Sequence, residues 1–414
     1  MSFFLLIIFA MPVGDVLWWW WADRWLRPLR RAKLYRVLLA LFVAVQLLGF
    51  GIVIGSRFIG ARVALPAGPL AVIYVWHIVV LSAIALAMLL ASLVHLACKL
   101  LARRRRPLSE PKSGTPQQSG PSRREVIAAA AAAAVPPLVA GGLVTKALTQ
   151  LGDFRINRMT IPLRDLPADL DGLTIAHVSD VHLGRFTHDK SLSQIADATN
   201  ALRADLVMLT GDLLDFSISD LGAGIDFVRK LDPRSGLFMI EGNHDLFDDR
   251  DAFESRVLTA GIPLLLNTSQ DVRVRGIDVQ VLGIKWGGPR RAGADPRARL
   301  RGGMWELHTA DTLAQLRTDP GLFPILLAHH PHAFDLAAEK RVPLTLAGHT
   351  HGGQLMLTRS LGAGSLMFKY WSGLYRKTDA MRDSALVVSN GVGNWFPLRI
   401  NAPAEIVQVT LRRA

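Results

Sequence analysis

The chain contains very little cysteine, and too few acidic residues to balance its basic ones. Cys98 is the only cysteine among 414 residues, so no disulfide can form within the chain and a site built from several thiolates is excluded. There are 47 lysines and arginines against 34 aspartates and glutamates, which gives a net charge of +13. Part of this excess comes from arginine clusters beside apolar segments, a pattern that fits membrane topology as well as it fits nucleic-acid binding.

Apolar stretches are concentrated before residue 150, where we expect the chain to enter a membrane. Three of them, at residues 3–21, 37–55 and 70–98, reach the length of about 20 residues that a spanning helix needs. The first ends in four consecutive tryptophans, whose rings suit the membrane–water interface. A fourth stretch, residues 126–144, is rich in alanine and interrupted by Pro136 and Pro137, so a spanning helix and a helix lying on the membrane surface are both open for it.

Arginine placement predicts how these stretches are oriented. The loop between the first two carries five basic residues, Arg24, Arg27, Arg30, Arg31 and Lys33. Four arginines at 103–106 follow the third stretch, whereas the loop between the second and third carries only Arg57 and Arg62. Because loops rich in lysine and arginine stay in the cytoplasm, we expect the N-terminus to be outside. A spanning fourth stretch would place everything after it outside as well.

Composition divides the chain into four parts. We expect membrane helices over residues 1–106, a flexible Pro/Ser/Gly-rich linker over 107–124, the fourth apolar segment over 125–150, and one α/β domain over 151–414. The sequence SRREVIA, which begins at Ser122, resembles a twin-arginine export signal placed internally. Basic residues that simply flank an apolar segment on its cytoplasmic side explain this sequence equally well. Both interpretations put the last part of the chain on the same side of the membrane.

Polar residues follow five apolar runs in the second part of the chain. The runs are GLTIAHVSDVH, ADLVMLTGDLLD, GLFMIEGNHD, FPILLAHHP and VPLTLAGHTH. Each has the length and continuous apolarity of a buried strand, and helix-like segments separate the early ones. This alternation indicates an α/β domain in which side chains from the strand ends gather at one edge of a sheet.

The residues at these strand ends favour metal binding. Burying so many aspartates and histidines in one crevice is costly unless cations balance them. Nitrogen and oxygen ligands without thiolate favour Mn, Fe or Zn. A pair of cations about 3.5–4 Å apart needs a bridging group, which a carboxylate such as Asp212 can supply, and such a pair activates water for attack on phosphorus.

The ordered motifs Asp-x-His, Gly-Asp-x-x-Asp, Gly-Asn-His-Asp, His-x-Pro and Gly-His-x-His resemble those of the calcineurin-like metallophosphoesterase superfamily, from Leu173 to the C-terminus. The tail SNGVGNWFPLRINAPAEIVQVTL is similar to the membrane-anchored bacterial branch, which includes enzymes similar to UDP-2,3-diacylglucosamine pyrophosphatases and exported phosphodiesterases. The resemblance implies a four-layer α/β/β/α sandwich after the membrane helices. It also implies hydrolysis of a phosphodiester or pyrophosphate in a phosphorylated small-molecule or lipid-linked substrate. We therefore expect a multi-pass protein of the bacterial inner membrane with its catalytic domain outside the cytoplasm.

The resemblance also implies a ligand set for two divalent metal ions. Its members are Asp180, His182, Asp212, Asn243, His329, His349 and His351. Asp180, His182 and His351 would hold the first ion. Asn243, His329 and His349 would hold the second, and Asp212 would bridge the two.

Two further residues receive catalytic roles from the same resemblance. His244 would stay off the metals and near the leaving-group oxygen, and Asp245 would orient it. Its imidazole could protonate the departing oxygen or stabilise its charge. His330 falls at the variable position of His-x-Pro and is not assigned as a ligand.

The sequence departs from one branch of the superfamily and leaves the substrate site open. Protein Ser/Thr phosphatases continue Gly-Asp-x-x-Asp with Arg-Gly, whereas Asp215 is followed here by Phe216 and Ser217, which disfavours a phosphoprotein substrate. Arg290 and Arg291 lie in an arginine-rich segment that fits either a solvated loop or a clamp for an anionic group. Aromatic contacts for acyl chains are open for three residues, although packing explains them as well: Phe186, Trp286 and Trp305.

Two functions from different classes are compatible with this pattern. The intact ligand set favours a membrane-anchored phosphohydrolase, and the tether disfavours nucleic acid as a partner. The alternative is a membrane receptor or scaffold whose metal site is structural or serves binding only, because one tether does not require so large a membrane part. Degenerate members tend to lose His244 or Asp212, and both are present.

Overall fold

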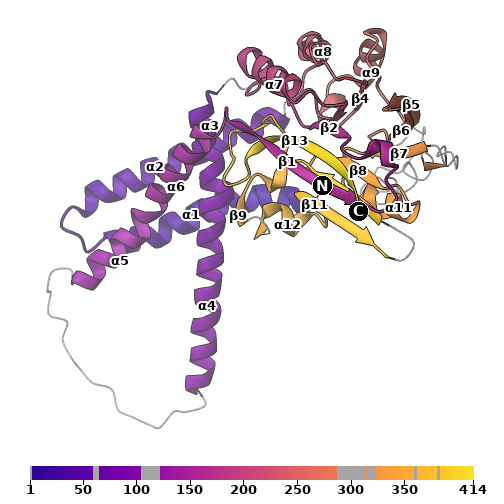
Figure 1. Ribbon diagram of the computed structural model, residues 1–414. Helices are drawn as coiled ribbons and strands as arrows, with labels where there is room; N and C mark the ends of the chain where they lie inside the picture. The colour runs from indigo at the N-terminus through magenta and orange to yellow at the C-terminus, as the bar shows by residue number, and fades with distance from the viewer. Residues whose placement is uncertain are drawn as a thin grey trace, which may run out of the picture. The chain divides into compact units, whose positions relative to one another are not determined.

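The computed structural model describes residues 2–58, 65–103, 122–286, 313–314, 322–358, 361–379 and 383–414. The chain forms two compact units, Met1–Leu148 and Thr149–Ala414. In the described residues the first contains helices and their connecting turns, and the second combines two large β-sheets and a two-stranded one with helices (Figure 1). Each unit is described separately.

Helices form the first unit. They are α1 (Ser2–Leu26), α2 (Ala32–Phe58), α3 (Ala67–Tyr74), the π-helical η1 (Val75–Leu81), α4 (Ser82–Arg103), α5 (Arg123–Ala133) and α6 (Val135–Thr149). Pro136 and Pro137 lie in the first turn of α6, where the missing N–H groups have no helical partner to lose.

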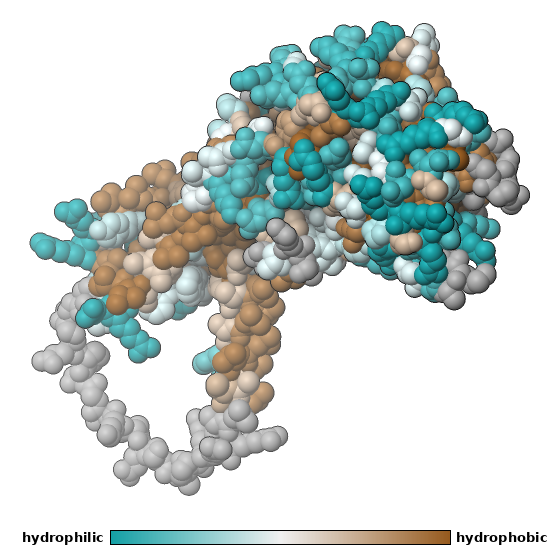
Figure 2. Space-filling view, viewed as in Figure 1, coloured by the Kyte–Doolittle hydropathy of each residue, from teal (hydrophilic) through white to brown (hydrophobic). Residues whose placement is uncertain are grey.

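Three helical stretches of the described chain are long and apolar enough to cross a membrane, Ala32–Gly55, Ala67–Leu100 and Arg123–Thr149. They contain the predicted second, third and fourth spans. The predicted first span lies in α1, and the side chains of residues 2–9 are outside the described part of the structure. Figure 2 shows that the surface of these helices is largely hydrophobic, whereas the visible surface of the second unit is largely hydrophilic.

A buried polar cluster joins α1 to the π-helical turn. Asp15 Oδ2 lies 2.9 Å from His77 Nε2, and the indole of Trp76 donates to Asp15 Oδ1 over 2.7 Å. His77 Nδ1 lies 2.8 Å from the carbonyl oxygen of Ile73. Because a carbonyl can only accept, Nδ1 carries a hydrogen, and the pair of Asp15 and His77 Nε2 shares one further proton. All four polar atoms of the carboxylate and the imidazole are therefore partnered inside the helical unit.

The second unit contains a four-layer sandwich. One sheet has the order β1 (Phe154–Leu163), β13 (Ala404–Arg413), β2 (Thr174–Val178), β3 (Leu206–Thr210) and β4 (Gly236–Ile240). The other has the order β11 (Gly373–Thr378), β12 (Asp383–Val388), β8 (Leu344–Ala347), β7 (Leu322–Leu327), β6 (Ile277–Gly283) and β5 (Thr268–Val274). Short elements complete the described fold: η2 (Ala168–Leu170), η3 (Ile218–Asp220), η4 (His244–Leu246), η6 (His351–Gly353), β9 (Met356–Thr358), β10 (Leu361–Gly362) and α12 (Ala363–Met367).

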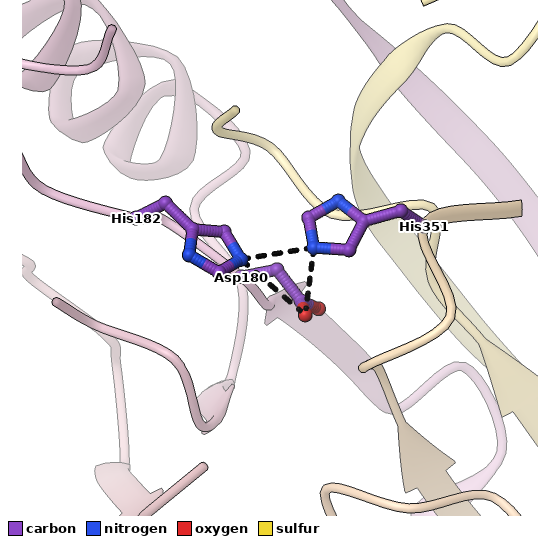
Figure 3. Close-up of side chains that lie close together, drawn as sticks. All are labelled: Asp180, His182 and His351. Atoms are coloured by element: carbon purple, nitrogen blue, oxygen red, sulfur yellow. Dashed lines mark hydrogen bonds and ion pairs between the residues drawn. The ribbon is translucent and has the colours of Figure 1, made fainter. Parts of the chain in front are cut away.

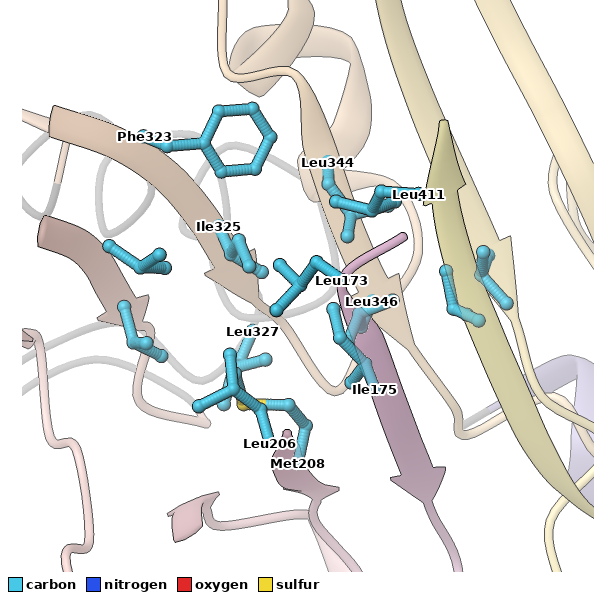
Figure 4. Close-up of a cluster of buried hydrophobic side chains, with 14 of the residues drawn as sticks. Leu173, Ile175, Leu206, Met208, Phe323, Ile325, Leu327, Leu344, Leu346 and Leu411 are labelled. Atoms are coloured by element: carbon cyan, nitrogen blue, oxygen red, sulfur yellow. The ribbon is translucent and has the colours of Figure 1, made fainter. Parts of the chain in front are cut away.

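Helices cover the outer face of each sheet. On the first sheet these are α7 (Asp189–Ala201), α8 (Leu221–Arg229) and α9 (Arg250–Thr259), which lie together in Figure 1. On the second sheet α11 (Ala333–Glu339) packs over β7 through Ala333 and Ala337. The central core lies between the sheets, where side chains such as Ile175, Met208 and Ile325 are fully buried (Figure 4). The predicted α/β/β/α order of layers is confirmed.

Parallel pairing gathers the strand ends that precede the motifs. β2, β3 and β4 are parallel neighbours in one sheet, and β7, β8 and β12 are parallel neighbours in the other. Parallel strands present their carboxyl ends at one edge of a sheet. The loops that follow β2, β3, β4, β7 and β8 therefore meet, and they carry the candidate ligands.

Candidate metal centre

Five of the candidate ligands adopt an uncommon backbone conformation. The φ angles of Asp180, His182, Asp212, His349 and His351 lie between 48° and 69°. Left-handed backbone is rare outside glycine, although aspartate and histidine tolerate it better than most residues. Such strain persists only where the surrounding fold determines it, and it clusters at functional sites. The strand ends are therefore shaped to aim these side chains.

One cluster consists of Asp180, His182 and His351 (Figure 3). The Nε2 atoms of the two histidines are 2.9 Å apart. Asp180 Oδ1 lies 3.3 Å from Nε2 of His351 and 4.0 Å from Nε2 of His182. All three residues are buried, so these three atoms converge at a point that bulk water does not neutralise.

A second cluster consists of Asp212, His329 and His349, with Asn243 beside it. Asp212 Oδ2 is 3.2 Å from His329 Nε2. Asn243 Oδ1 lies 3.3 Å from His329 Nε2 and 2.9 Å from His349 Nδ1. The loops after β3, β4, β7 and β8 thus each contribute one residue.

Asp212 connects the two clusters. Its Oδ2 atom lies 3.2 Å from His329 Nε2 in the second cluster and 3.6 Å from His182 Nε2 in the first. Its other oxygen, Oδ1, accepts the backbone N–H of His244 over 2.8 Å. That hydrogen bond fixes the carboxylate so that one oxygen faces both sets of imidazole nitrogens.

The environment of His329 tests whether these residues suit a cation. Nδ1 lies 2.7 Å from the carbonyl oxygen of Thr210, so Nδ1 carries the hydrogen. Nε2 then faces the oxygens of Asp212 and Asn243. Burial opposes a charge on this ring, but the neighbouring Asp212 and Asp180 raise the pKa of His329 to about 9. Its surroundings favour positive charge, and a divalent cation with nitrogen and oxygen ligands fits them.

His244 lies beside both clusters. Its ring centroid is 4.5 Å from that of His182, and Nδ1 lies 2.6 Å from the carbonyl oxygen of Asp215. Nδ1 therefore donates to Asp215, which leaves Nε2 as the other proton-carrying position. Burial lowers the pKa of His244, and Asp212 opposes this effect.

The hydrogen bonds of Asp245 run to backbone groups. Its carboxylate accepts the backbone N–H groups of Asp212, Leu214 and Gly242 over 2.8–2.9 Å. Asp245 thus ties the loop after β3 to the loop after β4. The His244 ring contacts the backbone carbonyl oxygen of Asp215, and the orienting role of Asp245 stays a prediction.

Comparison with known proteins agrees with this arrangement. Residues 173–353 match the family model "Calcineurin-like phosphoesterase". A zebrafish transmembrane protein with metallophosphoesterase domain is 31% identical over 269 residues, which are 61% of this chain and 56% of that protein. An uncharacterized metallophosphoesterase of Campylobacter jejuni is 30% identical over 60% of this chain and 61% of its own, and one of Bacillus subtilis is 28% identical over 66% and 94%. The match thus spans under two thirds of the first two relatives.

The family model and these relatives support the calcineurin-like metallophosphoesterase superfamily. The matched residues contain all seven candidate ligands together with His244 and Asp245. They also contain the two glycines after His351, of which Gly352 has a φ of 61°. A side chain at Gly352 would meet Asn390 at 2.6 Å, so the close turn beside the ligands requires glycine here.

Sequence reasoning missed one buried charge in the second unit. Arg399 is fully buried, and its Nη2 atom lies 3.2 Å from His351 Nδ1. The guanidinium also donates to the carbonyl oxygens of Asn390, Ala402 and Gly393. The signal was present in the tail as an arginine between apolar residues, FPLRI, but only the fold shows that it reaches a ligand.

The substrate-binding predictions have different outcomes. Arg290, Arg291 and Trp305 lie outside the described residues. The Trp286 ring lies 5.0 Å from that of His349 and 5.2 Å from that of His329, so it forms a wall of the second cluster. Phe186 instead lies under the guanidinium of Arg185, at 5.7 Å. Acyl contact by these aromatic rings stays a prediction.

Proposed function

We propose that this protein is a dinuclear metal-dependent phosphohydrolase. The observation that carries the proposal is the position of Asp212 Oδ2, which faces His182 of one ligand cluster and His329 of the other. Asp180, His182 and His351 would hold one ion. Asn243, His329 and His349 would hold the second, and Asp212 would bridge them.

The chemistry depends on charge that the protein does not itself supply. When bound, two divalent ions (Mn, Fe or Zn) would activate a water and neutralise the oxygens of a phosphoryl group. The protein's own residues then have two tasks. Asp212 keeps the two ligand clusters in register. His244, whose Nδ1 donates to the Asp215 carbonyl oxygen, presents Nε2 to the departing oxygen and would pass it a proton from the protonated ring.

We further propose a phosphodiester or pyrophosphate substrate that is part of a lipid-linked or cell-envelope molecule. The apolar helical stretches support this substrate class, because they would hold the enzyme beside a membrane. The arginine distribution favours the bacterial inner membrane with the catalytic unit on the outer side. Alkaline phosphatase fused after Thr149 should then be active, and an inactive fusion would reverse the orientation.

The test of the activity uses the full chain in detergent. With Mn²⁺ it should hydrolyse bis-p-nitrophenyl phosphate, and Asp212→Ala should abolish this hydrolysis. The matched control is Asp335→Asn, which removes a carboxylate on α11 that pairs with Lys369 and Lys377. An inactive wild type, or an Asp212→Ala variant as active as the control, contradicts the proposal.

A further inference from the structure

A groove in the helical unit is not explained by phosphoester hydrolysis. It has a volume of about 730 Å³ and lies between α2 and the α5–α6 segment. Its walls include Leu38, Leu39 and Phe42 on one side and Ala130, Ala133 and Pro137 on the other. Apart from one end, these walls carry only hydrocarbon.

The alanine run of the fourth apolar segment keeps the groove open. Positions 126, 129, 130, 133, 134 and 137 line it, and this spacing places them on one face of the helical segment. On α2, positions 35, 38, 39 and 42 follow the same periodicity. Four of the six positions on the α5–α6 side are alanines, whose methyl groups do not reach the large side chains of α2. Larger residues at these positions would fill the space.

One end of the groove is cationic. Arg30 and Arg31 lie in the turn that joins α1 to α2, and Tyr35 follows on α2. Two other arginines beside this turn, Arg27 and Arg36, share the carboxylate of Asp23, which offsets one of their two charges.

Arg30 and Arg31 are exposed, and in the described part of the chain neither has a carboxylate partner. Their charge is therefore available to a ligand. Leu38, Leu39 and Phe42 follow Tyr35 within about 10 Å along α2. The apolar part of the groove therefore begins directly beside the charged end.

We propose that this groove binds an acidic glycerophospholipid. The phosphate would lie at Arg30, Arg31 and the Tyr35 hydroxyl, and one acyl chain would lie along Leu38, Phe42 and the alanine face. Basic pockets between membrane helices on the cytoplasmic side bind anionic headgroups, and the arginine distribution predicts that side for this turn. The charge selects the headgroup, and the apolar groove selects a lipid over a free phosphate.

The experiment compares lipid binding to the delipidated full chain by native mass spectrometry in detergent. Phosphatidylglycerol should bind more tightly than phosphatidylcholine with the same acyl chains. Arg30→Gln/Arg31→Gln should weaken phosphatidylglycerol binding about 10- to 30-fold, the effect of two interfacial arginines, and leave phosphatidylcholine unchanged. Glycerophosphoglycerol, which is the headgroup alone, should not compete.

A matched variant separates this site from general surface charge. Arg24→Gln/Lys33→Gln removes the same charge from the same interfacial segment at positions that do not line the groove. It should retain phosphatidylglycerol binding to within about threefold, since charges away from the bound headgroup are largely screened. Ala130→Leu/Ala133→Leu fills the groove and should weaken both lipids. Far-UV circular dichroism checks that each variant keeps its helices.

Three results would overturn the proposal. They are equal affinity for the two lipids, equal losses in the two charge variants, and competition by glycerophosphoglycerol as strong as by the intact lipid. Hydrolysis of bis-p-nitrophenyl phosphate is measured on the same samples. Because the groove residues are not part of the metal centre, a failure of lipid binding leaves the proposed hydrolase intact, and the reverse also holds.

Discussion

Each unit of the protein buries aspartate and histidine together, but the two clusters are built differently. In the helical unit His77 Nε2 lies 2.9 Å from a carboxylate oxygen of Asp15, and every polar atom of the pair has a partner. In the second unit His182 Nε2 lies 2.9 Å from another imidazole nitrogen, that of His351. In the contact between Asp15 and His77, one shared proton is enough to give every polar atom a partner. The second cluster brings two imidazole nitrogens and a carboxylate oxygen to one buried point, an arrangement that a cation completes.

The backbone differs in the same way. Asp15 and His77 lie on helices, where the peptide groups are already paired. Asp180, His182 and His351 follow strand ends in left-handed conformation. Helix packing accounts for a regular backbone with a fully hydrogen-bonded polar pair. A strained backbone with converging side-chain donor atoms is costly, and a bound ion would offset that cost. Buried polar residues alone therefore do not identify a functional site; the convergence of several potential ligand atoms on one point does.

The strongest test of this contrast is the loss of the bridging carboxylate. Asp212→Ala should lower kcat by about a thousandfold or more, because both metal positions lose a ligand and the attacking water loses its activation. The measurements are hydrolysis of bis-p-nitrophenyl phosphate and metal content by mass spectrometry. Asp15→Asn in the helical unit is the comparison and should retain both activity and metal. Equal losses in the two variants would remove the distinction between the clusters.

The two histidines of the Gly-His-x-His motif should separate the two metal positions. His351→Ala removes a ligand of the Asp180/His182 cluster, whereas His349→Ala removes one from the Asn243/His329 cluster. Each variant should retain about one metal ion instead of two and lose about 10²-fold or more in kcat, since a single ion supplies only half of the clamp. Titration with Mn²⁺ followed by electron paramagnetic resonance distinguishes the remaining sites. Identical spectra from the two variants would contradict the assignment.

His244 should affect catalysis without affecting metal content. His244→Ala removes a proton donor and should lower kcat by about 10²-fold with both metal ions retained. Asp245→Asn should act differently, because its carboxylate holds backbone N–H groups of two ligand loops. We expect it to lower the unfolding temperature and the metal content together. A variant at Asp245 that changes only kcat would support the orienting role predicted for it from the sequence.

Breaking the contact between Asp15 and His77 should lower the stability of the helical unit without changing the metal content. Asp15→Ala leaves the imidazole of His77 and the indole N–H of Trp76 without their partner. Removing one member of such a buried cluster should destabilise the helical unit by about 1–3 kcal/mol. Thermal unfolding in detergent measures this loss, and metal content is the control. Stability equal to wild type would show that the pair is not structural.

Loss of the ion pairs between Asp335 and two lysines, Lys369 and Lys377, should have the smallest effect on stability. Burial would raise the pKa of Asp335, but hydrogen bonds from Lys369, Lys377 and Tyr370 lower it to about 2. The carboxylate thus stabilises the fold above the unfolded pKa near 4, and this contribution is lost as the pH falls from about 4 to 2. Because the Asp335 side chain is 35% exposed and solvent screens its ion pairs, Asp335→Asn should cost only about 0.5–1 kcal/mol at pH 7. The difference from wild type should vanish near pH 2, as measured by urea unfolding.

Much of the fold and of the candidate site followed from local patterns. Apolar runs that end in polar residues predicted the strands and their shared edge, because the length of a run and its end are properties of consecutive residues. The motif order then implied seven ligands, which the structure brings into two adjoining clusters. The hydrogen bonds of Asp245 could not be predicted from local patterns, because they run to backbone groups that follow another strand.

The sequence by itself determined the division into apolar helices and an α/β region, the order of the strands along the chain, and which residues are available as ligands. Only the tertiary structure decided that Asp212 faces both clusters, that Arg399 reaches His351, that Asp15 closes on His77, and that the alanine run leaves a groove. These contacts join residues tens to hundreds of positions apart. Their geometry is set by how sheets and helices pack, and local sequence does not contain that information.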